Sequence, residues 1–497
     1  MSSPGPTGSG YRRRLGGGRK EALDERLREA LLEPRDLEPI RLEGRLIPGL
    51  GAQALALVHE PVDCPGKPLD TLEGYVCGGG SHLASEYRPG AGNRKGRGVR
   101  SFRARCKKFL PGGLGYDRRG VDLDLSQEHE LVRDTVREFA RERVAPLAEE
   151  LDREGRFPYE LVAELAELGL MGIPIPERYG GAGSDTLAYA IAVEELTRVD
   201  SSVAITVAAH TSLGTMPILL FGNEQQREEW LPPLASGERL AAFGLTEPDA
   251  GSDAGATRTR AEQRNGSWIV NGSKIFITNA GTDISACVTI TARTGEDEIS
   301  NLVVPNGTPG YEISAPLKKL GWRASDTREL AFRDCAVPAE NLLGERGQGF
   351  RQFLEILDGG RISVAAMGVG LAQGAYDLAY AYAKERHQFG RPISDFQAVQ
   401  FRLADMATEI EGGRGLVYRA AWLKDQGRPF AREAAMAKLY TGELSNRAAN
   451  WALQIHGGYG YMDEYAISRL YRDQKILEIG EGTNEVQRMV IAKHLGL

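Results

Sequence analysis

A change in apolar period, from helical to β and back to helical, limits most strongly what this chain can fold into. Residues 122–240 and 351–497 repeat apolar side chains at helical spacing. Residues 241–350 instead contain short runs rich in Val, Ile and aromatic residues, separated by Gly and Pro. We therefore predict a mainly α protein with an antiparallel β domain between a helical N-terminal domain and a C-terminal helix bundle.

Residues 122–240 predict several helices with identifiable ends. Ser184 or Asp185 can cap a helix that runs through Leu196, because short polar side chains accept hydrogen bonds from the first helical N–H groups. Another helix is expected to begin at Asn223 and to stop before Pro232. Each end is a specific expectation that a structure can test.

The β pattern is densest in residues 268–278. This stretch has two β-rich runs joined by Asn271-Gly272, a dipeptide typical of two-residue hairpin turns, so we expect a hairpin there. Further short strands are expected at 288–291, 302–305 and 330–332.

The last region has the pattern of long amphipathic helices joined by short loops. Residues 394–397 have the spacing of a capping box, which favours a helix start at that point. Gly368 and Gly370 form an incomplete GxGxxG inside a helical pattern, which argues against a dinucleotide site of the Rossmann type. The expected helices cover 350–357 leading into 361–386, then 396–426, 432–454 and 465–479.

Residues 1–120 differ from the remainder in composition. They carry 22 Lys and Arg against 14 Asp and Glu and contain 22 glycines, with little apolar periodicity, so we expect low order. The change in composition after them motivates the hypothesis that this segment precedes the start of the working protein.

Composition excludes several classes of function for residues 121–497. Their net charge of −15 argues against nucleic-acid binding, and no apolar run reaches the roughly 18 residues of a membrane span. The five cysteines are interpreted as free thiols of a cytoplasmic protein. No metal site is expected, because the spacing of these residues fits no standard ligand pattern: Cys64, Cys77, His82, Cys106, His387 and His456. His210 lies in an apolar helical stretch and is interpreted as a core histidine.

One carboxylate near the C-terminus suggests chemistry. Glu481 lies between Gly480 and Gly482, which let a ligand approach the backbone closely, and it follows an apolar segment. A glutamate in an apolar setting has a raised pKa, which suits a general base near neutral pH. On this stretch alone, an exposed loop glutamate at a helix start is the simpler interpretation.

Two polar loops in the middle region are ambiguous alone. Residues 242–253 offer hydroxyls and free backbone N–H groups to a polar ring or a phosphate, but they equally fit a cluster of turns. Residues 321–328 form a second loop of this kind.

Four stretches in fixed order carry a resemblance to a known family: 245–253 (LTEPDAGSD), 385–390 (ERHQFG), 454–460 (QIHGGYG) and 480–485 (GEGTNE). Together they resemble the acyl-CoA dehydrogenase family over residues 122–497. The resemblance implies an oxidoreductase of fatty acid β-oxidation, FAD as cofactor, a homotetramer in which each flavin touches two subunits, and electron-transfer flavoprotein as acceptor.

The resemblance also assigns site residues. The implied residues that line the flavin from one subunit are Phe243, Leu245, Thr246, Ser252, Phe276 and Thr278, and those that reach it from a neighbour are Arg386, Phe389, Gln397, Gln454 and Gly458. The resemblance further implies that Thr483 and Glu485 close the cofactor site. The implied contacts to acyl-CoA are Ser252, Asp358, Arg361 and Gly482.

In this resemblance Glu481 takes the α-proton, and its backbone N–H together with a flavin ribityl hydroxyl holds the thioester oxygen. Some members carry the base just before the position of Arg361, where this chain has Gly360, which supports Glu481. Many straight-chain members have an aromatic residue at the position of Gly480, and its absence here enlarges the pocket, which suits a branched acyl group. Residues 357–362 look more like short-chain members, so short, medium and branched acyl groups all stay open. An oxygen-using flavin oxidase or monooxygenase and a non-catalytic flavin-binding scaffold are the alternatives.

Overall fold

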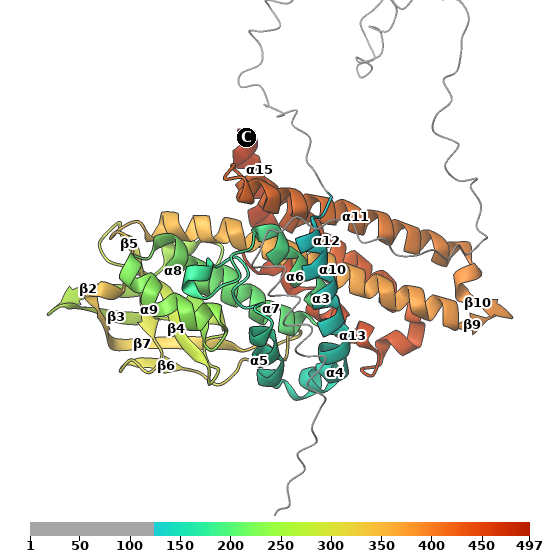
Figure 1. The fold of residues 1–497 in the computed structure, drawn as a ribbon, viewed down its shortest axis with the longest axis horizontal. Helices are drawn as coiled ribbons and strands as arrows, with labels where there is room; N and C mark the ends of the chain where they lie inside the picture. Colours follow the sequence, from blue (N-terminus) through green and yellow to red (C-terminus); the bar gives the residue numbers. More distant parts are fainter. Residues whose placement is uncertain (1–123) are drawn as a thin grey trace, which may run out of the picture. The chain divides into compact units, whose positions relative to one another are not determined.

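The computed structural model describes residues 124–497, and the expectations for residues 1–120 lie outside this part of the chain. The first helices form the domain that packs against α10 and α11 (Figure 1). The helices are α3 (Gln127–Phe139), α4 (Ala145–Glu154), α5 (Tyr159–Glu167), α6 (Thr186–Thr197), α7 (Ser201–Ala209), α8 (Met216–Phe221) and α9 (Glu224–Ala235), with π-helical turns η1 (Ala140–Val144) and η3 (His210–Thr215).

The predicted helix ends in this domain are partly confirmed. Asp185 caps α6 by accepting a hydrogen bond from the Ala188 N–H at 2.8 Å. The prediction that a helix stops before Pro232 is wrong, because α9 continues through Pro232 and Pro233 to Ala235. The prolines lie in its last turns, and the carbonyl of Pro232 still accepts the Ser236 N–H at 3.1 Å.

The middle region forms one sheet, which confirms the predicted fold class. Its order is β6-β7-β3-β2-β4-β5-β8, with mostly antiparallel neighbours, and β1 pairs in parallel with β4. The strands are β1 (Leu240–Gly244), β2 (Arg260–Arg264), β3 (Ser267–Thr278), β4 (Ser285–Arg293), β5 (Ile299–Pro305), β6 (Tyr311–Ile313), β7 (Thr327–Pro338) and β8 (Leu342–Leu343).

The predicted hairpin at Asn271-Gly272 is wrong, because β3 continues through this dipeptide, with a register shift between Val270 and Gly272, and pairs with β7 on both sides of it. The turn occurs instead at Asn265-Gly266, where both residues have positive φ (51° and 79°), between β2 and β3. Gly272 has a different role, since a Cβ there would lie 2.5 Å from the Oγ1 of Thr259 on the neighbouring chain segment.

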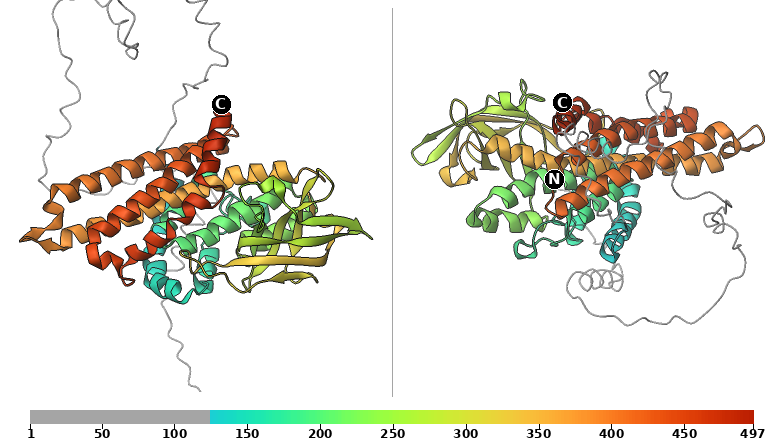
Figure 2. Two further views of the ribbon diagram at one scale, coloured as in Figure 1. Left: turned by 180° about the vertical axis from the view of Figure 1, so that it is seen from behind. Right: turned by 90° about the horizontal axis from the view of Figure 1, so that it is seen from above.

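The last region is helical, as predicted, and α10 is its longest helix (Figure 2). Gly349–Glu385 form a single helix rather than two, and Gly368, Gly370 and Gly374 allow close contact with atoms of α12, of α6 and of its C-cap residue Arg198. The elements are α10 (Gly349–Glu385), β9 (His387–Gln388), β10 (Arg391–Pro392), α11 (Gln397–Asp425), α12 (Ala431–His456), α13 (Ala466–Asp473), α14 (Ile476–Ile479) and α15 (Asn484–Leu495).

Two predicted details of this region are wrong. The Ser394 side chain does not cap α11, because residues 393–395 form a 3₁₀ turn and Phe396 occupies the N-cap position without a side-chain hydrogen bond. The expected helix 465–479 is divided into α13 and α14, with Gln474 and Lys475 between them.

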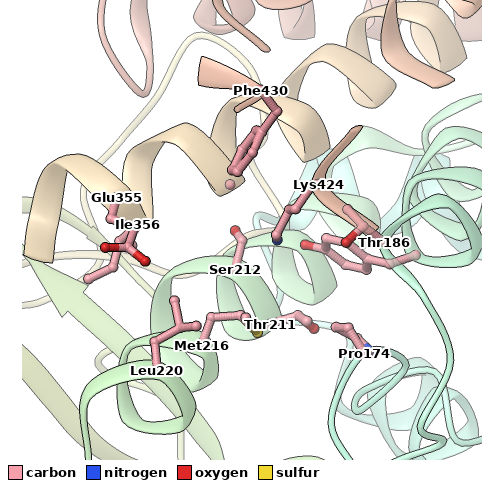
Figure 3. Close-up of a pocket in the computed structure, with 12 residues that line it drawn as sticks. Pro174, Thr186, Thr211, Ser212, Met216, Leu220, Glu355, Ile356, Lys424 and Phe430 are labelled. Carbon is pink, nitrogen blue, oxygen red and sulfur yellow. The ribbon is translucent and has the colours of Figure 1, made fainter. Parts of the chain in front are cut away.

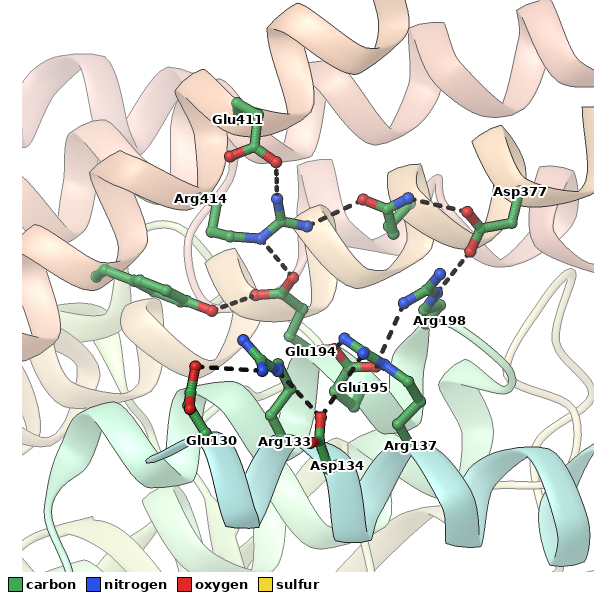
Figure 4. A network of polar contacts seen from close by, with 12 residues as sticks. Glu130, Arg133, Asp134, Arg137, Glu194, Glu195, Arg198, Asp377, Glu411 and Arg414 are labelled. Atoms are coloured by element: carbon green, nitrogen blue, oxygen red, sulfur yellow. Dashed lines mark hydrogen bonds and ion pairs between the residues drawn. The ribbon is translucent and has the colours of Figure 1, made fainter. Parts of the chain in front are cut away.

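A charged network joins α6 to the C-terminal helices (Figure 4). Arg414 of α11 donates to the buried Glu194 at 2.8 Å and to Gln373 of α10 at 3.0 Å. Arg137 of α3 donates to the neighbouring Glu195 at 2.7 Å. These paired charges fix α6 between α3, α10 and α11 because leaving a buried carboxylate unpaired is costly.

The stretch Ser201–Phe221 is apolar and long enough to cross a membrane, but 78% of its most apolar window is buried in the protein, as in a core helix. His210 lies within it and is fully buried. Its Nε2 lies 2.9 Å from the Leu234 carbonyl oxygen, and its Nδ1 accepts the Ala241 N–H at 3.1 Å. Burial lowers the pKa of His210 to about 4, which confirms the interpretation as a core histidine.

Candidate active site

Glu481 lies in the short loop between α14 and α15 and has an unusual backbone conformation. Its φ is 53°, in the left-handed region that non-glycine residues rarely adopt, and the next residue, Gly482, has a φ of 87°. Thr483 then caps α15 by accepting the Val486 N–H at 3.3 Å. A strained residue held by a structured loop is a frequent feature of functional sites.

The carboxylate of Glu481 points into the protein. Although the residue as a whole is half-buried, its Oε2 is buried and has no hydrogen-bond partner among residues 124–497. Burial raises the pKa of Glu481 to about 7, and the charges of Arg361 and Lys438 oppose that rise. A carboxylate with this pKa and a free oxygen is suited to accept a proton near neutral pH.

The room for this carboxylate comes from a glycine on α10. A Cβ added to Gly360 would lie 2.1 Å from Oε2 of Glu481, well inside van der Waals contact. The side chain can therefore keep its position only because residue 360 has none.

We expect Gly360→Ala to lower turnover by about 100-fold, since a displacement of about 1 Å in a reacting group can cost this much. The added methyl group must displace the Glu481 carboxylate. Steady-state kinetics measure the effect, and Gly359→Ala is the matched control, because a Cβ at 359 meets only the Lys424 Nζ at 3.3 Å. Equal rates for the two variants would contradict the claim that the Glu481 carboxylate keeps its position only because residue 360 has no side chain.

Asp358 and Arg361 lie one turn apart on α10, beside Glu481. They form an ion pair, and Arg361 is 4% exposed with its Nε free of partners among the described residues. The structure thus brings Asp358 and Arg361, two of the residues that the resemblance assigns to acyl-CoA, next to Glu481, which Gly482 follows in the chain. Ser252, the fourth expected contact to acyl-CoA, lies on the exposed loop after β1.

The expected flavin residues of one subunit come from β1 and β3. Phe243 is the next-to-last residue of β1 and Leu245 and Thr246 follow the strand, while the Thr246 carbonyl accepts the Ile275 N–H of β3 at 2.9 Å. This bond brings the loop beside Phe276, whose side chain is 65% exposed and whose φ is 64°. An exposed aromatic face with hydroxyls from Thr246 and Thr278 fits a planar ring with a polar edge.

A buried ion pair holds this loop. The Lys274 Nζ donates to Glu247 at 2.7 Å and to the Leu245 carbonyl at 3.1 Å, and both charged residues are almost fully buried. The sequence does not reveal this pair, since a lysine in an alternating strand pattern ordinarily faces solvent.

The second set of expected flavin residues lies far from the first in one chain. Phe243 and Leu245 of the first set pack with Phe353 and Leu357 in the first turns of α10, whereas Arg386 follows the end of this helix. A rise of about 1.5 Å per residue separates residues 357 and 386 by roughly 43 Å. Phe389, which is 93% exposed, lies in the turn between β9 and β10. Gln397 at the start of α11, Gln454 near the end of α12 and Gly458 after it are also exposed.

A cavity of about 210 Å³ lies next to α10 (Figure 3). Its wall includes Gly359, Ser212, Lys424 and Phe430, and Glu481 is not among the lining residues. Gly360, the neighbour of Gly359, faces the Glu481 carboxylate, so the cavity lies beside the candidate base rather than at it.

Comparison with known families gives three matches in chain order. The acyl-CoA dehydrogenase N-terminal domain matches residues 126–238, the middle domain matches 242–335 and the C-terminal domain matches 347–496.

Two curated relatives cover the same part of the chain. A probable acyl-CoA dehydrogenase, YngJ, of Bacillus subtilis is 53% identical over 76% of this chain and 100% of its own length. A short-chain specific acyl-CoA dehydrogenase of Clostridium acetobutylicum is 47% identical over 75% of this chain and 99% of its own.

Solved structures also match about three quarters of this chain. Butyryl-CoA dehydrogenase from Megasphaera elsdenii has a TM-score of 0.74 at 43% identity and covers 76% of this chain and 100% of its own. An acyl-CoA dehydrogenase complexed with FAD from Bacillus anthracis has a TM-score of 0.71 at 36% identity, over 75% and 67%. A structure described as electron transferring flavoprotein of Acidaminococcus fermentans has a TM-score of 0.74 at 45% identity, over 75% and 99%.

Proposed function

The chain belongs to the acyl-CoA dehydrogenase family, and from this premise we propose that it converts a short-chain acyl-CoA to the trans-2-enoyl-CoA with Glu481 as the base. As a member it is an FAD-dependent oxidoreductase acting on CH–CH bonds. The observation that carries the proposal is the buried Glu481 oxygen, which has no hydrogen-bond partner among residues 124–497, faces Gly360 and is flanked by Arg361.

The chain's own groups account for the proton. The α-carbon beside a thioester is a weak acid, and the Glu481 carboxylate accepts its proton as the C–H bond breaks. When bound, FAD supplies the acceptor for the hydride that leaves the β-carbon. The Glu481 N–H donates to no acceptor among the described residues, which leaves it available for the thioester oxygen, where negative charge develops.

Arg361 and Asp358 are proposed to contact the CoA part of the substrate. Their ion pair fixes the guanidinium, whose Nε retains a free donor. A buried guanidinium with a spare N–H suits a polar or anionic ligand group.

We further propose that a neighbouring copy completes the flavin site. Arg386, Phe389 and the exposed residues near them cannot reach the Thr246 loop of their own chain, because that loop follows Phe243 and Leu245 at the start of α10 and these residues lie beyond its other end. We propose a homotetramer as the assembly and electron-transfer flavoprotein as the electron acceptor, and a matching structure described as an electron transferring flavoprotein supports the second part. Sedimentation equilibrium tests the assembly, and a mass of one chain would contradict it.

The relatives named for short-chain or butyryl substrates support a short acyl group. We include branched acyl groups among the proposed substrates because Gly480 leaves space beside Glu481. A Cβ at residue 480 would meet only the backbone oxygen of Ile476 at 3.3 Å and its Cγ1 at 3.9 Å, and the φ of −67° suits any residue.

We expect Gly480→Tyr to lower the ratio of branched to straight-chain kcat/KM by about tenfold, since filling a pocket by a few carbon atoms costs about 1–3 kcal/mol. Isobutyryl-CoA and butyryl-CoA are the pair to compare. Gly480→Ala is the control and should keep the ratio, because its Cβ fits. An unchanged ratio in the tyrosine variant would contradict the branched assignment.

Product analysis tests the reaction class. Enoyl-CoA formed with an artificial electron acceptor and with little hydrogen peroxide supports a dehydrogenase. Stoichiometric peroxide would identify an oxidase instead.

A further inference from the structure

Lys438 is a fully buried lysine on α12, surrounded in sequence by the buried alanines 434, 435 and 437. Its Nζ donates to the Gly482 carbonyl at 2.8 Å and to the Asn484 Oδ1 at 3.2 Å. Gln487 donates to the same Gly482 carbonyl at 2.8 Å and to the Glu481 carbonyl at 3.2 Å. The peptide groups on the C-terminal side of Glu481 are therefore held by two buried side chains.

The charge of Lys438 is not neutralised by its partners. The acceptors of its Nζ are a carbonyl and an amide oxygen, and no ion pair within 4.0 Å joins it to a carboxylate in residues 124–497. Arg361, the other cation near Glu481, is paired with Asp358. Removing the lysine would thus remove the one unpaired positive charge of the described site.

We propose that Lys438 is a positioning residue for the base, which holds the Gly482–Thr483 peptide directly after the Glu481–Gly482 peptide and supplies the unpaired positive charge that favours the ionised carboxylate. This inference rests on the proposed function, in which Glu481 is the base. It assigns to the lysine no contact with substrate or flavin.

The surrounding charges define the expected pH effect. Glu481 is faced by Arg361 from α10, Lys438 from α12 and Tyr189 from α6, and Lys438 is also near Glu478 and Glu485. Burial lowers the pKa of Lys438 to about 8, so the amine is still protonated at pH 7. Because a nearby cation lowers the pKa of a carboxyl group, loss of Lys438 raises the pKa of Glu481 above about 7.

The test is the pH profile of kcat/KM for butyryl-CoA in the purified FAD-loaded protein. Activity falls at acid pH as Glu481 becomes protonated. We expect Lys438→Met and Lys438→Gln to move this acid limb upward by about one pH unit, within the range for removal of a neighbouring charge. Lys438→Arg, which keeps the charge, should keep the limb in place. Lys438→Gln retains a donor for the Gly482 carbonyl, and it is the variant that tests the role of Lys438 if the methionine variant does not fold.

Lys475→Met is the control, because Lys475 is exposed and pairs with Glu478. If the wild type is active and Glu481→Gln is inactive, an acid limb that stays in place in Lys438→Gln overturns the role of Lys438 and leaves Glu481 as the base. A wild type that does not oxidise acyl-CoA overturns the proposed function and this inference with it.

Discussion

Glu481→Gln is expected to lower acyl-CoA-dependent reduction of the flavin by about 1000-fold, within the range for removal of a general base. Glutamine has nearly the same shape but cannot accept the α-proton. Since Gly360 leaves space for this side chain and Thr483 caps α15, the fold should tolerate the change. Stopped-flow absorbance under anaerobic conditions measures the rate.

Glu478→Gln is the matched control for this variant. Glu478 lies three residues earlier on α14, where it pairs with Lys475 and accepts a hydrogen bond from Asn446 at 3.0 Å. Its rate should stay within a few-fold of the wild type. If Glu481→Gln retained more than a tenth of the wild-type rate, another group would have to be the base.

Lys274→Met is expected to lower the free energy of unfolding by about 3–5 kcal/mol, the usual cost of removing one partner of a buried ion pair. The Nζ of this wholly buried lysine also donates to Thr257 at 3.1 Å and Thr291 at 3.0 Å, besides Leu245 and Glu247. Without it, the Glu247 carboxylate is buried with no opposite charge. A fall in the thermal unfolding midpoint of roughly 10 °C is the expected result.

The pKa of Glu247 explains the direction of this effect. Burial alone would raise it, but the charge and hydrogen bond of Lys274 bring it down to about 2. A lowered folded-state pKa contributes stability above the unfolded value, and this stability is lost as the pH falls through the folded value. The variant should lose that contribution at neutral pH.

Two further variants separate this account from a general packing defect. Lys274→Met with Glu247→Gln should recover part of the loss, because no unpaired charge remains. Lys318→Met, an exposed lysine of the same domain, should leave the midpoint unchanged. The account would be contradicted if Lys274→Met unfolded at the wild-type temperature.

The sequence identified the helix–β–helix order because the apolar period is a local property of each segment. It did not identify the hairpin, because Asn265-Gly266 and Asn271-Gly272 carry the same turn signal. What separates them is tertiary: Gly272 is needed where Thr259 approaches, and β7 pairs across it. A dipeptide alone does not report these contacts.

The candidate site likewise combines residues that the sequence reveals with residues that only the structure reveals. Glu481 could be proposed as a site residue from the sequence, since its flanking glycines and its order after the other three motifs are features of the sequence. Lys438 and Lys274 were not, because sequence does not show that a lysine in an alanine-rich helix or an alternating strand is wholly buried. The importance of Gly360 was visible only in part: the sequence showed that no second base is present, and the structure shows what the missing side chain leaves room for.

The most direct test of the proposed function is an anaerobic titration of the purified yellow protein with butyryl-CoA, followed by isobutyryl-CoA and an aromatic acyl-CoA, while the visible flavin absorbance is recorded. The account predicts that butyryl-CoA bleaches this absorbance at near-equimolar amounts and that the aromatic thioester does not. A flavin band unchanged by every short straight or branched acyl-CoA would contradict the assignment of Glu481 as the base of an acyl-CoA dehydrogenase.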